Sequence, residues 1–273
     1  MPKDFNVYEW NKKRYLGEAM GTPKAIILAG APGAGKGYVL SGLDLGGLKV
    51  LNVDNAYIDL LKKANVSLDL KNATPQGRSD AAKAMAQANK EFKGKVAATI
   101  EGKESFVLDG TAASIKQTAN LKNELEEAGY DVFMLYVYTD LERSLKQNEA
   151  RFEKSGGKDR SLAPAIVLRT WSDVTSNFKA YEAMFKDNFV SVANTLEDEK
   201  LSDVADIIKK YLDPFKPTGT KPKTDAQKAR SEKSKAELNA KVKELLADDN
   251  VNMIINNSVS KEEAQAKIKQ FLS

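Results

Sequence analysis

A glycine-rich turn that ends in Gly-Lys is the segment of this sequence best suited to bind phosphate. Gly30 and Gly35 lie five positions apart, and a lysine follows the second glycine. Glycine lets the backbone curl closely around an oxyanion, so that successive N–H groups converge on it, and the lysine adds a full positive charge. The pattern predicts a nucleotide-phosphate site made of Gly30, Ala31, Pro32, Gly33, Ala34, Gly35, Lys36, Gly37 and Tyr38.

This turn departs from the usual pattern at one position. Many phosphate-binding loops carry a serine or threonine directly after the lysine, and its hydroxyl binds Mg²⁺. Here that position is Gly37, and Tyr38 follows it. We therefore expect Mg²⁺ to depend on a carboxylate elsewhere in the chain, together with ATP oxygens and water.

Two aspartates follow apolar segments and are candidates for the chemistry. Asp54 follows Val50-Leu51-Asn52-Val53 and could accept the proton of an attacking hydroxyl, which is the usual role of an aspartate in phosphoryl transfer. Alternatively, it belongs to a helix N-cap, because Asn52, Asp54 and Asn55 all favour strand-to-helix corners. Position alone leaves both interpretations open.

Asp109 ends the apolar run Phe106-Val107-Leu108, a pattern that places a carboxylate near bound Mg²⁺. Many strands also end in an Asp-Gly turn, so the pattern alone is weak. It indicates a carboxylate near Mg²⁺ because a phosphate-binding loop lies upstream in the same chain. Thr111, two residues further on, could cap the next helix or touch a substrate phosphate.

Alternating apolar runs and helical patterns indicate the fold that would position these residues. Ala25–Ala29 is a short, continuous apolar run that predicts a buried parallel strand directly before the loop. The other predicted strands are Lys49–Val53, Ser105–Leu108, Val132–Tyr138 and Phe189–Ala193. The predicted helices are Lys36–Ser41, Tyr57–Ala64, Gln76–Ile100, Ser114–Ala128, Leu141–Lys154, Ala163–Asp187 and Leu201–Tyr211. This order predicts an α/β three-layer sandwich around a parallel sheet, of the P-loop NTPase type, with a small C-terminal helical appendage.

Composition changes near residue 214 divide the chain. We expect an N-terminal arm at 1–22, a P-loop domain at 23–213, a proline- and lysine-rich linker at 214–224 and a helical tail at 225–273. Residues 216–273 hold 12 basic and 8 acidic residues, which accounts for the whole net charge of +4. Because its helices are weakly apolar, we expect the tail to dock on the body, on a second copy or on a protein partner, or to be partly ordered.

The residue types that are missing exclude several kinds of chemistry. The chain has no cysteine and no histidine, so thiolate nucleophiles, disulfides, Ser-His-Asp triads and histidine metal sites are excluded. Any general base must be a carboxylate, a lysine or a tyrosine. No apolar run is long enough to span a bilayer and no signal-peptide pattern is present, so we expect a cytoplasmic protein without a membrane partner.

The sequence resembles the zeta-toxin and polynucleotide-kinase branch of small P-loop kinases, over about Lys24 to Ala193. The families' Gly-x-Pro-Gly-x-Gly-Lys is present as Gly30-Ala31-Pro32-Gly33-Ala34-Gly35-Lys36. Adenylate kinases also place glycine after the lysine, followed by a threonine where this chain has Tyr38. The resemblance implies that Asp54 is the base that activates the substrate hydroxyl, and that Asp109-Gly110-Thr111 is the family's strand-end segment.

A lid region extends the resemblance. The family has Arg-Asn-x-x-Arg on a helix and a further arginine in the loop after it. This chain has Gln147-Asn148-Glu149-Ala150-Arg151 and then Arg160. Arg151 and Arg160 match the family's arginines and would neutralise the transition state, whereas Gln147 replaces the first arginine. Arg143 or Arg169 could substitute for it, and Ser155-Gly156-Gly157 could act as a hinge that closes Arg160 over ATP.

These residues together predict an ATP- and Mg²⁺-dependent kinase that phosphorylates a hydroxyl of a nucleotide, a nucleotide-sugar or a nucleic-acid end. Arg78 and Lys83, in the insertion that often shapes the acceptor site in such kinases, are candidate acceptor contacts. The neutral body of the protein, with 30 residues of each sign before residue 216, argues against a broad nucleic-acid surface. An alternative is a degenerate nucleotide-binding module with a structural role and no turnover, which Gln147 and the Gly37-Tyr38 pair favour.

Overall fold

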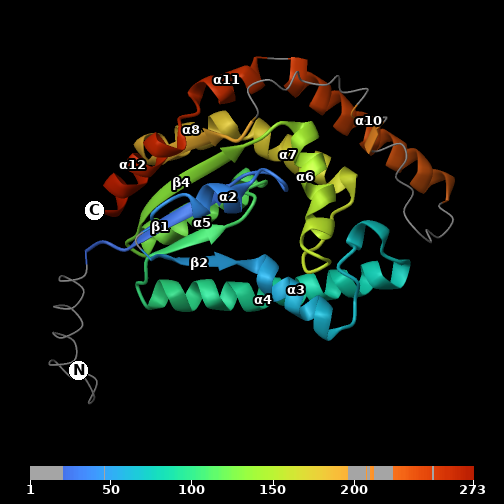
Figure 1. Ribbon diagram of the computed structural model, residues 1–273, viewed down its shortest axis with the longest axis horizontal. Helices are drawn as coiled ribbons and strands as arrows, with labels where there is room; N and C mark the ends of the chain where they lie inside the picture. The colour runs from blue at the N-terminus through green and yellow to red at the C-terminus, as the bar shows by residue number, and fades with distance from the viewer. Residues whose placement is uncertain (1–20, 46, 196–206, 208–209, 212–223, 248) are drawn as a thin grey trace.

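A five-stranded parallel sheet forms the centre of the molecule (Figure 1). This computed structural model describes residues 21–45, 47–195, 207, 210–211, 224–247 and 249–273. The strands are β1 (Lys24–Ala29), β2 (Lys49–Asn52), β3 (Phe106–Asp109), β4 (Asp131–Tyr138) and β5 (Phe189–Ala193), in the spatial order β2-β3-β1-β4-β5. Because all are parallel, their carboxyl ends meet at one edge of the sheet, where open α/β sheets bind ligands.

Successive residues of the central strands point to opposite faces of the sheet and enter two separate cores. Ala25, Ile27 and Ala29 of β1 belong to one core, whereas Ile26 and Leu28 belong to the other. β4 alternates in the same way, with Tyr136 and Tyr138 in the first core. Because both faces are covered, these strands are apolar throughout, and all five strand predictions agree with the structure to within one residue.

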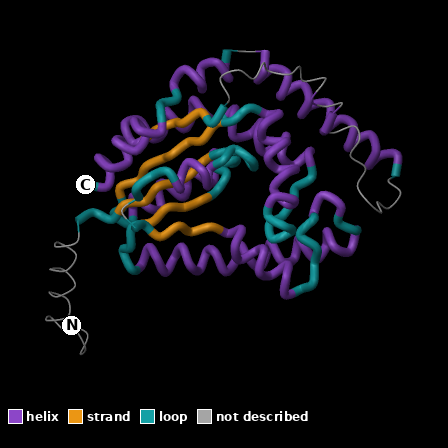
Figure 2. Tube along the Cα trace, viewed as in Figure 1, coloured by secondary structure: helices purple, strands orange, loops and turns teal. Residues whose placement is uncertain are grey.

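Helices cover both faces, which confirms the predicted three-layer sandwich (Figure 2). α2 (Lys36–Ser41) lies on the face of Ile26, and α5 (Ile115–Glu127) and α8 (Phe178–Phe185) contact β4 on the opposite face. The remaining helices of the body are α3 (Val53–Lys63), α4 (Pro75–Glu101), α6 (Leu141–Lys154) and α7 (Pro164–Ser176), with short 3₁₀ turns η1 (Leu70–Asn72) and η2 (Lys186–Asn188). No helix among the described residues has the length and apolarity needed to cross a bilayer.

Two helix predictions are corrected by the structure. α3 begins at Val53 instead of Tyr57, because the Asn52 side chain caps it by accepting the N–H of Asp54 at 2.6 Å. The single helix predicted over Ala163–Asp187 is divided at Asn177 into α7 and α8. There the Asn177 side chain donates to Ala113 O, which fixes the chain at the break. The helix predicted at Leu201–Tyr211 lies mostly outside the described residues.

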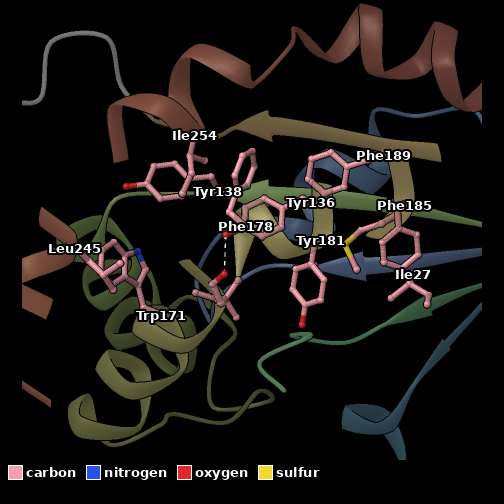
Figure 3. Packing of buried hydrophobic residues seen from close by; sticks show 14 of the residues in the cluster. Ile27, Tyr136, Tyr138, Trp171, Phe178, Tyr181, Phe185, Phe189, Leu245 and Ile254 are labelled. Carbon is pink, nitrogen blue, oxygen red and sulfur yellow. Dashed lines mark hydrogen bonds between the residues drawn. The ribbon is translucent and has the colours of Figure 1, made fainter. Parts of the chain in front are cut away.

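The C-terminal helices pack on the body. They are α10 (Asp225–Ala247), α11 (Asn250–Asn257) and α12 (Lys261–Leu272), and all three lie within the segment expected to be a helical tail. Leu245 of α10 and Ile254 of α11 lie among the aromatic side chains of the first core (Figure 3). Ala264 and Ile268 of α12 lie fully buried in the second core, beside residues of β1 and α2. The expectation that the tail docks on the body is therefore met by these helices, while the predicted linker before Thr224 lies outside the described residues.

Candidate active site

The phosphate-binding loop joins β1 to α2 and requires glycine at specific positions. Gly33 and Gly35 have φ values of 79° and 80°, a region that other residues rarely adopt. A Cβ at Gly33 would lie 2.4 Å from Ser144 O, and one at Gly35 would lie 2.2 Å from Asn194 Nδ2. Gly37 differs, since nothing lies within 4 Å of a Cβ built there. The two tight positions are thus pressed against α6 and the end of β5, whereas Gly37 faces open space.

Lys36 lies at the start of α2 and folds back over the loop. Its Nζ donates to Gly30 O at 2.8 Å and to Ala31 O at 3.2 Å. Burial lowers the pKa of Lys36 to about 8, although the nearby carboxylates of Asp109 and Asp54 act in the opposite direction. The lysine is therefore desolvated and held close to the residues that would cradle phosphate.

A cleft of about 880 Å³ opens at the carboxyl edge of the sheet and collects most of the predicted site residues. This volume suits a small-molecule ligand. Its walls come from the phosphate-binding loop, the ends of β2 and β3, the first turn of α3, α4, and the segment from α6 to the loop beyond it. The lining residues are Pro32, Gly33, Ala34, Gly35, Lys36, Gly37, Asn52, Val53, Asp54, Met85, Asp109, Gly110, Thr111, Gln147, Arg151, Lys154, Ser155, Asp159, Arg160 and Leu162.

Asp54 and Arg160 face each other in this cleft. Arg160 Nη2 donates to Asp54 Oδ1 at 2.6 Å, and the guanidinium lies 5.6 Å from the centroid of the Tyr57 ring. The arginine side chain is 11% exposed, and its Nε is buried without a hydrogen-bond partner among the described residues. A hydrogen-bond donor thus remains unused beside the carboxylate that is the candidate base.

Asp109 ends β3 next to Asn52, which ends β2. Asn52 Nδ2 donates to Asp109 Oδ2 at 2.5 Å. Burial raises the pKa of Asp109, whereas the charge of Lys36 and the hydrogen bond from Asn52 lower it. The described residues contain no group of three or more acidic side chains that could hold a metal ion by themselves. Mg²⁺ in kinases commonly needs only one or two carboxylates in addition to substrate phosphates and water, so Asp109 suits such an ion.

Asp159 links the two candidate lid arginines. Its Oδ2 accepts from Arg151 Nε, and its Oδ1 accepts the backbone N–H of Arg160 at 2.7 Å. The Asp159 N–H in turn donates to Ser155 Oγ at 2.9 Å. The loop that carries these residues passes through Gly156 and Gly157, whose φ values of 61° and 77° suit glycine.

The lid loop is also tied to the body at its far end. Ser161 N donates to Leu68 O at 3.1 Å, and Ser161 Oγ donates to Asp69 Oδ1 at 2.8 Å. Asn148 Nδ2 donates to Leu162 O at 2.9 Å, which holds the loop to α6. Arg160 is therefore presented to the cleft from a loop that is fixed on both sides.

Some sequence-predicted residues lie away from this cleft. Tyr38 is 64% exposed, and Lys261 Nζ from α12 lies 3.3 Å from the centroid of its ring. Arg78 is not among the lining residues, and its Nη1 donates to Ala73 O at 2.6 Å. Thr111 lines the cleft but does not cap the next helix, because Ser114 is the N-cap of α5.

Two contributors were missed in the sequence. Asn52 was considered only as a capping residue, yet it both caps α3 and orients Asp109. Asp159 stands next to Arg160, and an acidic residue between two candidate phosphate-binding arginines is a signal that could have revealed it. Both act on charged residues of the cleft by hydrogen bonding.

Comparisons with known proteins give a family and a fold. The zeta toxin family matches residues 8–203 of the chain. None of the curated proteins matches it. Among solved structures, the chain is similar to the AvrRxo1-ORF1:AvrRxo1-ORF2 complex with sulphate ions, at 17% identity over 91% of this chain and 81% of that chain, with a TM-score of 0.51.

Two further solved structures are similar at a lower TM-score. One belongs to the PezAT chromosomal toxin-antitoxin system of Streptococcus pneumoniae, with 16% identity over 88% of this chain and 98% of that chain and a TM-score of 0.48. The other is the AvrRxo1-ORF1:-ORF2 complex with ATP, with 17% identity over 93% of this chain and 78% of that chain and a TM-score of 0.48. At such identities, structural likeness bears on the fold alone.

Proposed function

The chain belongs to the zeta-toxin family of P-loop kinases, and from that membership we propose that it transfers the γ-phosphoryl group of ATP to a hydroxyl of a nucleotide, a nucleotide-sugar or a nucleic-acid end. The observation that carries this proposal is the meeting of Lys36, Asp54 and Arg160 in one cleft. A phosphate-binding lysine, a candidate base and a candidate charge-neutralising arginine are the groups that such a transfer needs.

Phosphate binding falls to the loop and to Lys36. The backbone N–H groups at the start of α2 lack intrahelical partners, as in any helix, and add the positive end of the helix dipole. Lys36 Nζ, which contacts loop carbonyls at present, is close enough to exchange them for phosphate oxygens. This arrangement favours a polyphosphate over a neutral ligand.

Asp54 would act on the acceptor. In the proposed step, an acceptor hydroxyl oxygen attacks the γ-phosphorus, the bond from that phosphorus to the β–γ bridging oxygen breaks, and ADP leaves. The hydroxyl proton passes to the Asp54 carboxylate. Because Asp54 lies in the first turn of α3, opposite Arg160, its oxygens are directed into the cleft that would hold both substrates.

The arginines would neutralise charge that spreads over the transferred group. Arg160 and Arg151 both line the cleft, and the planar guanidinium binds phosphate through two N–H groups at once. The Nε of Arg160 is buried without a hydrogen-bond partner among the described residues, so it would donate to such an oxygen once the side chain turns away from Asp54. Electrostatic stabilisation of this kind is usually the largest part of phosphoryl-transfer catalysis.

Mg²⁺ fits the donor set of the cleft. Asp109 would hold it, together with ATP oxygens and water, and no hydroxyl is available at Gly37. When bound, the ion would supply positive charge to the β- and γ-phosphates. The half-buried Asp109 carboxylate, kept in place by Asn52, is suited to a divalent cation because partial desolvation makes an isolated charge unfavourable.

The proposal is tested by incubating the full chain with Mg²⁺ and γ-labelled ATP and a panel of nucleosides, nucleotides, nucleotide-sugars and oligonucleotides with free 5′ hydroxyls. Transfer of label to one class, lost in Asp54→Asn, would support the proposal and identify the acceptor. ATP binding with no transfer to any member of the panel would instead favour the alternative of a binding module without turnover. Because the body before residue 216 carries no net charge, nucleotide-sugars are the first class to try.

A further inference from the structure

Three consecutive carbonyl groups of the phosphate-binding loop each accept a hydrogen bond from a polar side chain outside the loop. Ser144 Oγ donates to Pro32 O, and Asn194 Nδ2 donates to Ala34 O at 2.9 Å. Between them, Gln147 Nε2 donates to Gly33 O at 2.7 Å, in the amide orientation that satisfies both of its neighbours. The three side chains come from α6 and from the end of β5, so two separate elements hold one loop.

A single arginine joins two of these three side chains. Arg143 Nε donates to Gln147 Oε1 at 2.9 Å, and Arg143 Nη2 donates to Asn194 Oδ1 at 3.3 Å. Each amide therefore accepts from the same guanidinium with its oxygen and donates to the loop with its nitrogen. Asn194 is itself fixed, since its N–H donates to Tyr138 O at 2.8 Å and its carbonyl accepts from Thr139 Oγ1 at 2.9 Å.

The direction of these hydrogen bonds bears on phosphate binding. A peptide unit that turns its carbonyl outward turns its N–H to the opposite side, because the unit is planar and trans. Fixing the carbonyl of Ala34 therefore fixes the N–H group of Gly35. Fixing the carbonyl of Gly33 fixes the N–H group of Ala34, which donates to Ala31 O at 3.1 Å, so that Gln147 holds the turn directly before the open N–H groups. In the described part of the chain no hydrogen bond engages the N–H groups of Gly35, Lys36 or Gly37, which leaves them open to an anion.

The same geometry explains why position 147 is glutamine. An amide can accept from Arg143 and donate to Gly33 O at once, whereas arginine has no acceptor. An arginine at 147 would place a second guanidinium against Arg143, with nothing to accept its Nε proton. Gln147 and Arg143 thus form a matched pair, and the departure from the arginine of the resembling families is tied to a residue one helical turn away.

We propose that Arg143, acting through Gln147 and Asn194, is a positioning residue that sets the orientation of the peptide units in the phosphate-binding loop. Gln147 is required for this role, so its presence where the resembling families have a lid arginine is not simply the loss of that arginine. The inference rests on the proposed function, because it assumes that the loop binds the phosphates of ATP. It assigns Arg143 to the support of the loop, away from the substitute-lid role considered for it above.

The test measures the dissociation constant for Mg-ATP by titration calorimetry in the full chain and in single variants. Gln147→Glu keeps the length and the acceptor but loses the donor to Gly33 O, and should weaken binding about tenfold. Arg143→Met should have a similar effect. Gln147→Arg, which introduces the arginine of the resembling families, should also weaken binding. Arg230→Met, the same change at an exposed position of α10 outside the cleft, is the matched control.

A double variant separates positioning from a general loss of stability. The cycle needs Gln147→Met and Arg143→Met as its single variants. If Arg143 acts through Gln147, the dissociation constant of Arg143→Met/Gln147→Met for Mg-ATP should be at most about threefold higher than that of the weaker-binding single variant, because coupled residues are not additive. The melting temperature of each variant should stay close to that of the Arg230→Met control. If Arg143→Met does not fold, Arg143→Lys, which keeps the charge and loses the fork, takes its place.

Two results would overturn the inference while leaving the proposed function intact: tighter Mg-ATP binding by Gln147→Arg, or wild-type affinity in both Gln147→Glu and the Arg143 variant. A wild-type chain that does not bind Mg-ATP at all would overturn the proposed function, and the positioning role with it. The two failures are therefore distinguished by the wild-type measurement alone.

Discussion

Arg160 and Asp54, which lie 106 positions apart in the sequence, form a 2.6 Å ion pair across the cleft. The candidate base is therefore held by the candidate lid arginine. Phosphate oxygens would compete with the Asp54 carboxylate for this arginine. In the proposed mechanism, nucleotide binding would thus change the electrostatic surroundings of the base as well as fill the cleft.

Asp54→Asn should lower kcat by about a hundredfold or more, because a positioned general base contributes on that scale. ATP affinity should be retained and become somewhat tighter, since Lys36 and the loop are untouched and Arg160 is released from its ion pair with Asp54. Stopped assays with labelled ATP, combined with a binding titration, separate the two quantities. Near-normal turnover with intact ATP binding would show that Asp54 is not the base.

Asp159→Asn should affect the two lid arginines together. The substitution removes the negative charge that contacts Arg151 and weakens the bond to the Arg160 N–H. ATP binding should become severalfold tighter because the net positive charge of the cleft rises, while kcat falls about tenfold as both arginines lose their orientation. Steady-state kinetics over a range of ATP concentrations give both values.

A matched control for Asp159→Asn is Asp80→Asn. Asp80 lies on α4, away from the cleft lining, and makes comparable local hydrogen bonds to Gln76 and Lys83. This variant should leave both KM and kcat unchanged. A parallel effect of the two substitutions would mean that Asp159 influences the site only through the total charge of the protein.

Gly33→Ala should abolish ATP binding, whereas Gly37→Ala should leave it close to normal. At Gly33 the new Cβ would lie 2.4 Å from a backbone oxygen of α6, and the φ of 79° is unfavourable for alanine by about 1–2 kcal/mol. At Gly37 the Cβ meets open space. Calorimetric titration with Mg-ATP checks both, and equal effects of the two alanines would contradict the loop geometry described above.

ATP affinity should fall as the pH rises above about 8, the pKa to which burial lowers Lys36. Below that value the lysine already carries its proton, so affinity should be nearly constant; above it, binding must take up a proton. Titrations from pH 7 to 9.5 measure this trend. Lys36→Gln should bind ATP weakly at every pH, and its affinity should not fall as the pH rises. Because this folded pKa is below the unfolded value of 10.5, the ATP-free protein should gain stability as pH rises through the same window.

Ile268→Ala should lower the free energy of unfolding by about 2–4 kcal/mol, because it leaves a cavity in the core under α2. Ile166→Ala removes the same atoms from a side chain that is 51% exposed, and should cost little. Urea denaturation of both variants measures the difference. Similar losses in the two would mean that α12 is not an integral part of the fold.

The sequence predicted the parts of this protein whose signals are local. β1, the loop and α2 are contiguous. Their apolar run, glycines and lysine indicate a strand, a phosphate-binding turn and a helix without any information from distant residues. The five strands were placed correctly for the same reason, since strands buried on both faces are apolar throughout. Asp109 could be placed in the cleft because it ends one of those strands.

Contacts between distant segments were not predictable in the same way. The ion pair of Asp54 with Arg160 depends on the hydrogen bonds that hold the lid loop to Leu68 and Asp69. No periodic pattern in the sequence predicts those hydrogen bonds. The start of α3 depended on whether Asn52 capped it, a choice that local propensity left open. The hydrogen bonds of Gln147 require α6 to lie against the loop, which only the folded chain reveals.

The packing of α12 has a consequence for the order in which the chain is synthesised. A chain emerging from the ribosome completes β1, the loop and α2 long before residues 261–272 exist. Until then, the side of Ile26, Leu28 and Val39 that Ala264 and Ile268 cover remains in water. A nascent chain would therefore carry the whole phosphate-binding sequence without this support until residues 261–272 had been made.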